Sequence, residues 1–461
     1  MSIELQLVGS DPALPQSTGI VVVGGGIIGT SATLFLARAG MRVVLCEKGE
    51  IGAEQSGRNW GWCRQTGRDP AELPLMAESL RLWRNKSALS GAETGFRTTG
   101  IMYIFDSEAE EEAHRSWLDK TELYQTGARL LDGAALARLW PGATRQFRGA
   151  LYTPSDGGAE PSMAAPEIAE AARRCGAVIM TNCAVRGLEL TNGMVAAAVT
   201  ERGVVRCDAA LLAGGAWSRL FCGPLGIDLP QLKVTGSVMR TAPLPGGPEI
   251  SAAGPKFGYR RMRDGGYVVS QASATISDIV PDSFRLLLDY LPAWRAEWKR
   301  LRLRLGQRFI EEWRMPRRWR LDERSPFEAT RILDPAPSRS VLDEARETIM
   351  QVLPVFRGTR VTARWGGVID VTPDALPIIS PAPGIANLCL ATGFSGHGFG
   401  IGPGAGRLAA ELVLGLPTCV DAEPFAATRF IRTRRPPVSQ TEPLDQISTL
   451  SGPSAKLRPG V

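Results

Sequence analysis

A glycine-rich turn between a buried strand and a helix constrains the fold most. Ile20–Val23 is a run of four β-branched apolar residues, which predicts a short buried strand. Gly24, Gly26 and Gly29 follow at the spacing G-x-G-x-x-G, and a helical apolar pattern then runs to Gly40. The first glycine permits a tight turn, the second lets the backbone approach a pyrophosphate, and the third lets the helix pack on the sheet. The free amides of the helix N-terminus would face the diphosphate.

A second predicted strand, Met41–Cys46, leads directly to Glu47. A carboxylate at the end of the second strand of such a unit takes the ribose hydroxyls of an adenosine. The alternative is a membrane span, since residues 12–37 carry no charge. Five glycines in that stretch and the continuation into a second strand favour a dinucleotide site instead.

The whole chain sets wider limits. Its 461 residues allow two or three domains with sizeable cores. Met1–Gly19 has neither a basic start nor an apolar run, so we expect no signal peptide. Eight cysteines without a C-x-x-C pair argue against a zinc site and a disulfide scaffold, and no metal is predicted. This cysteine usage suits a reducing cytoplasm.

A long polar loop, residues 48–65, follows the ribose acid. Long ordered loops of this kind are usually functional. Its Ser56, Arg58 and Asn59 offer donors for a second phosphate or a ribityl chain, and Trp60, Trp62 and Arg64 are candidates to face a substrate. The alternative is that the tryptophans belong to the core and Arg58 forms a surface ion pair.

Three motifs together resemble a known family. The strand–GGG–helix unit, the loop EKG-x-IG-x-EQS-x-R and a later GFSGHGF are similar to the FAD-dependent amino-acid oxidase/dehydrogenase superfamily, over residues 19–430. That superfamily includes D-amino-acid oxidase and dehydrogenase, glycine and sarcosine oxidases, and bacterial L-amino acid deaminases. The resemblance implies an α/β chain with a Rossmann-type FAD-binding domain and a second, mixed β-sheet substrate domain, in a glutathione-reductase-like FAD fold.

The expected domains are discontinuous. We assign 18–80, 150–218 and 355–420 to the FAD-binding domain, 81–149 and 219–354 to the substrate domain, and 431–461 to an extended or disordered tail. Thr98–Phe105 is predicted as a strand, and Pro166–Gly176 as a helix with Pro166 near its first turn. His114 lies in a charged helical stretch and is expected at the surface.

The resemblance also implies a set of cofactor contacts. Val185 would contact the adenine through its backbone, and Ala213–Gly215 would lie near the diphosphate, with plain sheet packing as the alternative for both. Five glycines in Thr392–Pro403 would let that loop run against the flavin ring, and Pro403 would open a helix to about Leu414 whose N-terminus points at the ring. The expected cofactor-binding residues are Gly24, Gly26, Ile27, Ile28, Gly29, Glu47, Lys48, Gln55, Ser56, Arg58, Asn59, Val185, Ala213, Gly214, Gly366, Gly393, Gly396, His397, Gly398 and Phe399. Sarcosine oxidases attach FAD through a cysteine in the segment that corresponds to 360–388, which has none here, so non-covalent FAD is predicted.

The substrate residues come from a hairpin and two later motifs. Aromatic and guanidinium groups alternate along Phe257–Tyr267, and by similarity to the deaminases Arg260 is the candidate clamp for a substrate carboxylate. Tyr259 or Tyr267 would add a hydroxyl; the alternative is a set of solvated arginines on an exposed strand. The catalytic candidates are Arg260, Tyr259, Tyr267, Trp365 and His397, with packing beside the flavin favoured over a base role for His397.

A basic segment stands apart from these motifs. Trp294–Arg320 holds ten Arg or Lys against three Glu, with apolar residues at helical spacing. This indicates a basic amphipathic insert, about 284–325, of the kind that contacts a membrane surface or a partner. An ordinary domain helix with a solvated basic face is the alternative. No readout module accompanies the charge, so nucleic-acid binding is not expected.

The resemblance implies removal of a hydride from the Cα of an amino acid or N-substituted amino acid to flavin N5, giving an imine that hydrolyses to a 2-oxo acid. O2 or a respiratory-chain quinone would reoxidise the flavin. We expect a cytoplasmic protein, peripheral on the inner membrane face if 294–320 contacts the bilayer. The alternative function is a flavin-binding electron-relay or assembly subunit of a hetero-oligomeric, membrane-associated amine or opine dehydrogenase. An NAD-dependent dehydrogenase is disfavoured because no second nucleotide fingerprint appears.

Overall fold

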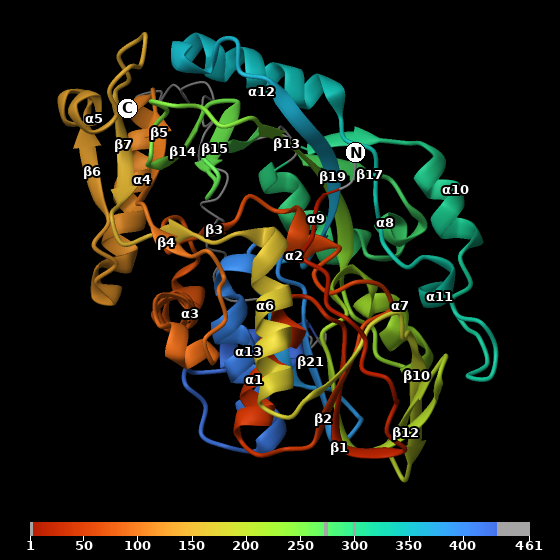
Figure 1. Ribbon diagram of the computed structural model, residues 1–461. Coiled ribbons are helices and arrows are strands. Elements are labelled where there is room, and N and C mark those ends of the chain that lie inside the picture. Colours follow the sequence, from red (N-terminus) through yellow and green to blue (C-terminus); the bar gives the residue numbers. More distant parts are fainter. Residues whose placement is uncertain (1–2, 272–274, 298–300, 431–461) are drawn as a thin grey trace, which may run out of the picture.

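The computed structural model describes residues 3–271, 275–297 and 301–430. Two sheets occupy opposite halves of the molecule (Figure 1). The lower half in that view holds the parallel strands and the helices packed on them, and the upper half holds a larger, mostly antiparallel sheet. The α/β class with a second mixed sheet, expected from the sequence, is confirmed.

The lower sheet is built around β1 (Ser17–Val23). It pairs in parallel with β2 (Val43–Cys46) on one side and β12 (Gly203–Leu212) on the other, so that Val23 lies between Cys46 and Leu212. Three strands therefore end at the same edge, and the glycine turn follows the middle one, β1. The strand predicted from Met41 begins at Val43, because the Met41 amide still closes the preceding helix on Leu36 O at 3.1 Å. The remaining strands of this sheet are β9 (Val178–Met180), β10 (Val185–Thr191), β11 (Met194–Thr200), β20 (Ile378–Pro381) and β21 (Leu388–Thr392).

Three helices cover one face of the lower sheet. α1 (Ile27–Arg38) packs against α13 (Gly398–Leu414) and α6 (Pro161–Arg174), as Figure 1 shows. The contact with α13 is close, since a Cβ on Gly406 would lie 2.4 Å from Ser31 Cβ.

Two helix starts were predicted wrongly. α6 begins at Pro161, which occupies the first-turn position assigned to Pro166, and Pro166 lies inside the helix. α13 begins at Gly398, so Pro403 lies within it rather than at its start, although the predicted end at Leu414 is confirmed.

The upper sheet centres on β13 (Leu232–Thr241), which pairs antiparallel with β19 (Val361–Val371) and with the hairpin strand β16 (Tyr267–Ser270). The other hairpin strand is β15 (Phe257–Arg261), and α12 (Arg339–Val352) packs on this part of the sheet. β19 lies within a range assigned to the FAD-binding domain, yet it pairs in the upper sheet. The remaining strands of this sheet are β5 (Ile101–Phe105), β6 (Arg129–Asp132), β7 (Gly149–Thr153), β14 (Ser251–Gly254), β17 (Thr275–Asp278) and β18 (Leu301–Arg304).

A short third sheet holds the loop after the glycine turn. In it β8 (Gly157–Gly158) pairs with both β3 (Trp62–Cys63) and β4 (Arg97–Thr98). The other helices are α2 (Gln55–Arg58), α3 (Leu73–Arg84), α4 (Glu108–Thr121), α5 (Gly133–Leu139), α7 (Ser218–Cys222), α8 (Pro281–Arg285), α9 (Leu287–Glu297), α10 (Gln307–Arg314) and α11 (Pro326–Ala329).

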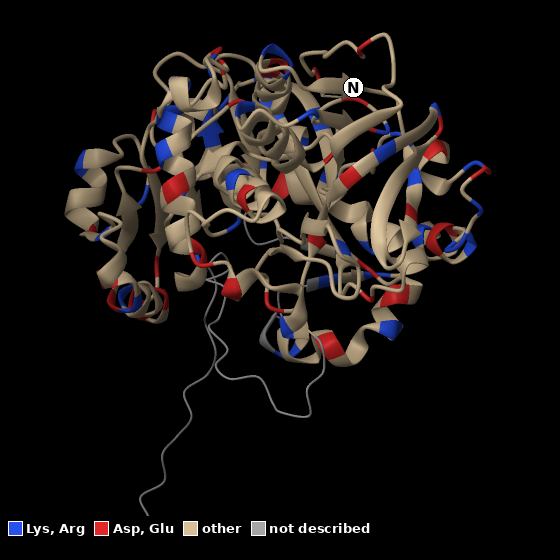
Figure 2. Cartoon of the chain, turned by 90° about the horizontal axis from the view of Figure 1, so that it is seen from below, with Lys and Arg blue, Asp and Glu red and all other residues tan. Residues whose placement is uncertain are grey.

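The basic segment does not form the single amphipathic helix that its spacing suggested. The strand β18 lies between α9 and α10 and pairs in parallel with β17. Its sequence LRLR alternates with the period of a strand, which decides the local structure. Several of the positive charges are also paired: Arg304 bonds Asp278 at 2.6 Å, and Arg317 bonds Asp282 at 2.9 Å. Figure 2 shows Lys and Arg interspersed with Asp and Glu over this view of the molecule.

Two smaller expectations have separate outcomes. His114 does lie on a charged helix, α4, but its side chain is buried, with its ring centroid 5.5 Å from that of Phe105. The expected tail, residues 431–461, lies outside the described residues. Among the helices that the structure describes, none is long and apolar enough to cross a membrane.

Candidate functional site

A cavity of about 1480 Å³ runs from the glycine turn of the lower sheet to the strands of the upper sheet. Its walls include Val23, Cys46 and Leu212, the last residues of the three parallel strands. Ligands of open α/β sheets bind at this edge. The volume exceeds the roughly 300–1,000 Å³ of an ordinary ligand pocket, which leaves room for a dinucleotide and a small substrate together.

The glycine turn is the first wall. Gly24 has φ +109°, and a Cβ there would lie 2.4 Å from Ala213 O, so the turn accepts only glycine. A Cβ on Gly29 would lie 1.9 Å from Gly24 O, because the first turn of α1 packs directly on the glycine turn. Gly24, Gly26, Ile27 and Ile28 line the cavity, whereas Gly29 and Ala213 lie behind this wall.

Glu47 stands at the end of β2, where the ribose acid was expected, and lines the cavity. Its carboxylate accepts hydrogen bonds from the amides of Gly25 and Gly49, each at 2.7 Å. Burial raises the pKa of Glu47, against the opposing effects of Lys48 and the two amides. A carboxylate has about four acceptor positions, so two such bonds leave capacity for a ligand hydroxyl.

The polar loop after Glu47 lines the same wall through Lys48, Gln55, Ser56, Arg58 and Asn59. Several of its donors and acceptors are engaged by the protein itself. The Ile27 amide donates to Ser56 Oγ at 2.8 Å, and Asn59 Nδ2 donates to Ser56 O at 2.7 Å. Arg58 is buried, donating to Ala53 O at 2.8 Å and to Gly366 O at 3.0 Å, so it fastens the loop to β19.

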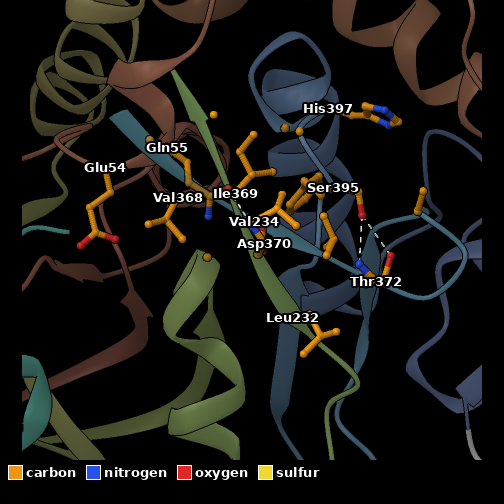
Figure 3. Close-up of a pocket in the computed structure, with 18 of the residues that line it drawn as sticks. Glu54, Gln55, Leu232, Val234, Val368, Ile369, Asp370, Thr372, Ser395 and His397 are labelled. Atoms are coloured by element: carbon orange, nitrogen blue, oxygen red, sulfur yellow. Dashed lines mark hydrogen bonds between the residues drawn. The ribbon is translucent and has the colours of Figure 1, made fainter. Parts of the chain in front are cut away.

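The C-terminal glycine loop forms another part of the wall, with Gly396, His397, Gly398 and Phe399 lining the cavity. Gly393 lies behind this wall: its φ is +71°, and its amide donates to Asp370 Oδ2 at 2.9 Å. Thr372 N donates to Ser395 Oγ at 3.1 Å, which fixes the loop a second time (Figure 3).

Asp370 was missed by sequence reasoning, although it lines the cavity and anchors this loop. Gln231 Nε2 also donates to its carboxylate, at 2.8 Å. Burial raises the pKa of Asp370. Its partners lie far away in sequence, and the only available signal was an acid within a strand of apolar residues.

His397 projects from the loop at one end of the site (Figure 3). Its Nδ1 lies 3.1 Å from a carboxylate oxygen of the fully buried Glu72. Burial and the charge of Arg68 lower the pKa of His397 to about 4, so the imidazole is neutral at pH 7 and its Nδ1 donates to Glu72. Although burial raises the pKa of Glu72, His397 and Arg68 lower it overall, so this carboxyl stays ionised.

The hairpin residues predicted to hold the substrate are not on the cavity wall. Arg260 is buried, and its two terminal nitrogens bond the Glu160 carboxylate at 3.0 and 3.2 Å. Tyr259 accepts a hydrogen bond from Trp140 Nε1 at 2.7 Å, and Tyr267 donates to Pro248 O at 2.9 Å. These assignments are corrected, because the hairpin turns these side chains into the core and towards Glu160.

Trp365 and Gly366 likewise lie behind the wall. Trp365 Nε1 donates to Arg58 O at 3.1 Å, and a Cβ on Gly366 would lie 2.3 Å from Pro335 O. The neighbouring Gly367 is the residue that lines the cavity. Val185 and Gly214, in contrast, do line it, as expected of cofactor contacts.

Two arginines, one in the polar loop and one just after it, line the cavity, whereas Arg260 does not. Arg64 and Arg68 are both buried and line the cavity beside Trp60, Trp62 and Tyr103. The Arg64 guanidinium carbon lies 5.4 Å from the Tyr103 ring centroid. Trp60, Trp62 and Arg64 were candidates in the sequence; Arg68 was missed, and its spacing of four residues from Arg64 was the available signal.

Comparison with known proteins agrees with this geometry. Residues 19–412 match the family described as FAD dependent oxidoreductase. The L-amino acid deaminase from Proteus myxofaciens, solved in complex with anthranilate, is 33% identical, with a TM-score of 0.89 over 92% of this chain and 96% of that one. Glycine oxidase from Pseudomonas aeruginosa is 25% identical over 89% of this chain and 99% of its own length. Mitochondrial dimethylglycine dehydrogenase from Mus musculus is 24% identical over 88% of this chain, which spans only 43% of that protein. The chain belongs to the FAD-dependent oxidoreductase family, and its cofactor is FAD.

Proposed function

We propose that the protein oxidises the Cα–N bond of an amino acid or N-substituted amino acid to an imine, which water then hydrolyses to a 2-oxo acid. The observation that carries this is one cavity that joins the dinucleotide turn to a buried arginine pair at the His397 end. The likeness to an L-amino acid deaminase at 33% identity supports a substrate of the amino-acid type.

The residues present fit FAD. The turn around Gly24 leaves no room for a Cβ, and the first residues of α1 line the cavity, so their amides would hold the diphosphate. Glu47 would take the ribose, Val185 the adenine, and the 396–399 loop the flavin ring. When bound, FAD supplies the acceptor for the hydride that leaves the substrate Cα. Among the described residues that line the cavity, Cys46 is the only cysteine; it lies at the dinucleotide end, which supports non-covalent binding.

Arg64 would hold the substrate carboxylate. A guanidinium binds a carboxylate through two parallel hydrogen bonds, which fixes the direction of the adjoining Cα–H bond. Trp60 and Trp62 would exclude water around it, since their rings meet edge-on with centroids 5.1 Å apart on the same wall. Alignment of this kind accounts for much of the rate of a bimolecular step.

His397 would orient the substrate and would not abstract a proton from it. An imidazole with a pKa of about 4 is a weak base at neutral pH, and its Nδ1 is engaged by Glu72. The substrate amine would therefore lose its proton to solvent before oxidation. The buried Glu72 fixes which nitrogen of His397 carries the proton and so which nitrogen faces the site.

O2 or a respiratory-chain quinone would be the electron acceptor. Peripheral membrane contact through the segment 294–320 would favour a quinone, because respiratory-chain quinones lie in the membrane. Exposed apolar side chains support the contact more than charge does, because Leu305 and Trp313 are 71% and 70% exposed while several arginines there are ion-paired. A membrane contact made by these few exposed apolar side chains would be weak and reversible.

The test is a substrate panel on the purified FAD-loaded protein. D- and L-amino acids, N-methyl amino acids and N-carboxyalkyl amino acids are supplied with O2 or a quinone analogue, and 2-oxo acid is measured. We expect one group to be oxidised, and Arg64→Met to raise KM at least about tenfold for it, with Arg129→Met as the matched control outside the cavity. Flavin that no amine in the panel reduces, or an unchanged KM in Arg64→Met, would contradict the proposal.

A further inference from the structure

Asp370 is a buried acid on the cavity wall to which the proposed function gives no chemical role. It lies near the end of β19, lines the cavity and is only 1% exposed (Figure 3). Its Oδ2 accepts hydrogen bonds from Gln231 Nε2 at 2.8 Å and Gly393 N at 2.9 Å, with Thr392 Oγ1 at 3.4 Å. The amide of Asp370 donates to Gln55 Oε1 at 3.3 Å. These bonds tie four segments around the cavity to one carboxyl group.

The groups around this carboxylate are neutral. Within the described part of the chain, Asp370 has no ion-pair partner. Lys233 stands opposite it in the pairing of β13 with β19, but Lys233 Nζ bonds Glu312 at 3.3 Å. Asp374, which also lines the cavity, differs because Arg429 Nε bonds it at 2.7 Å. Buried charges are usually paired with an opposite charge, so Asp370 is an exception on this wall.

The hydrogen bonds favour the ionised form of Asp370. The carbonyl of Gly215 accepts from Gln231 Nε2 at 3.1 Å, which orients this amide so that its nitrogen also faces Asp370. The Gly393 amide can only donate. Burial raises the pKa of Asp370, and these donors oppose that rise. The charge also acts on a neighbour, because burial raises the pKa of Tyr290 and the charge of Asp370 adds to the increase.

We infer that Asp370 lowers the reduction potential of the bound FAD, through a negative charge that no cation balances. Its partner Gly393 belongs to the same glycine loop as residues 396–399, which would face the flavin ring. A hydride brings negative charge onto that ring, and like charges repel strongly where water does not screen them. The inference concerns the cofactor and does not depend on which amine is oxidised, so its failure would leave the proposed function standing.

The test measures the potential of the FAD-loaded protein without any substrate. Dithionite reduces the protein stepwise under anaerobic conditions together with a reference dye, and flavin absorbance is followed. Asp370→Asn removes the charge but keeps an oxygen that can accept from Gly393. We expect its reduction equilibrium to shift at least about tenfold towards reduced FAD, which is about 30 mV for a two-electron couple. An unchanged potential in Asp370→Asn would overturn the inference.

Two further variants check that the shift follows the charge at this position. Asp322→Asn is the control, since Asp322 is an exposed acid paired with Arg320 outside the cavity, and its potential should not change. Asp370→Glu keeps the charge and should keep the low potential. A potential in Asp370→Glu as high as that of Asp370→Asn would overturn the inference. Melting temperatures identify a variant that fails to fold, and Asp370→Ser then replaces Asp370→Asn with the same expected shift.

Gln231→Met separates the charge from the position of the loop. It removes a donor to Asp370 and disturbs the same contacts, but it leaves the carboxylate in place. We expect no shift towards reduced FAD in this variant. Equal shifts in Gln231→Met and Asp370→Asn would assign the effect to movement of the loop and would overturn the inference.

Discussion

Replacement of Arg260 by Met tests whether this arginine supports the site or binds substrate. Arg260 holds the Glu160 carboxylate with both terminal nitrogens, at 3.0 and 3.2 Å, and its Nε donates to Trp60 O. The side chains of the pair are each only 4% exposed. Arg260→Met therefore leaves a buried carboxylate without its counter-ion and releases the loop that carries Trp60 and Trp62.

Removing one member of a buried ion pair costs about 3–5 kcal/mol of unfolding free energy, because the other charge stays buried and uncompensated. The Glu160→Met variant should lose a similar amount. The double variant Glu160→Met with Arg260→Met should lose clearly less than the sum, by about 1–3 kcal/mol, since no unpaired charge remains. Arg129→Met, an exposed arginine over Tyr152, is the control and should stay within about 0.5 kcal/mol.

The assay is urea unfolding of the FAD-loaded proteins, followed by tryptophan fluorescence and circular dichroism, with KM measured on the same preparations. A loss below about 1 kcal/mol in Arg260→Met, or a double variant equal to the sum, would refute the ion-pair reasoning. If KM rose steeply with stability unchanged, Arg260 would be the substrate clamp after all.

Three further outcomes are expected. Gly29→Ala should abolish FAD retention, because the added Cβ would lie 1.9 Å from Gly24 O; retention is measured by the flavin absorbance of the purified protein. Gly223→Ala is the control and should remain yellow, since a Cβ there would have nothing within 4 Å. A yellow Gly29→Ala protein would contradict this. Burial lowers the pKa of His114 to about 4, below its unfolded value of about 6.5, so the unfolded chain binds more protons and stability should fall as pH drops from about 6.5 to 4. His114→Phe should flatten that decline in stability by up to about 1.4 kcal/mol per pH unit. If the melting temperatures of His114→Phe and of the unchanged protein fell equally as pH dropped, this role of His114 would be excluded. The double variant Leu305→Ser with Trp313→Ser should co-sediment less with anionic vesicles. Leu123→Ser is the control, because Leu123 is 93% exposed on another surface, and its binding should not change. Equal binding of the double variant and the control would contradict the membrane contact.

Local pattern was enough to predict the glycine turn and the place of Glu47 beside it on the cavity wall. The strand, the glycine turn, the helix and the acid are consecutive, so the residues that contact one another are also close together in the sequence. The turn around Gly24 and the position of Glu47 at the end of β2 follow from steric limits and strand period alone.

The substrate half depends on contacts that the sequence does not display. Arg260 was chosen for its chemistry, but Glu160, a hundred residues away, takes up its guanidinium. Asp370 was missed because its role comes from Gln231 and Gly393, on other elements. The basic segment was misjudged since a four-residue strand, β18, interrupts the helical spacing and pairs with β17. In each case long-range pairing overrode a local pattern.

Anaerobic titration of the purified protein with an amino acid tests oxidation at Cα directly, with flavin absorbance and 2-oxo acid measured in the same cuvette. Oxidation at Cα predicts bleaching that ends at one equivalent of substrate per flavin, with one equivalent of 2-oxo acid formed. Flavin that stays oxidised against every amino acid, or bleaching without 2-oxo acid, would contradict it.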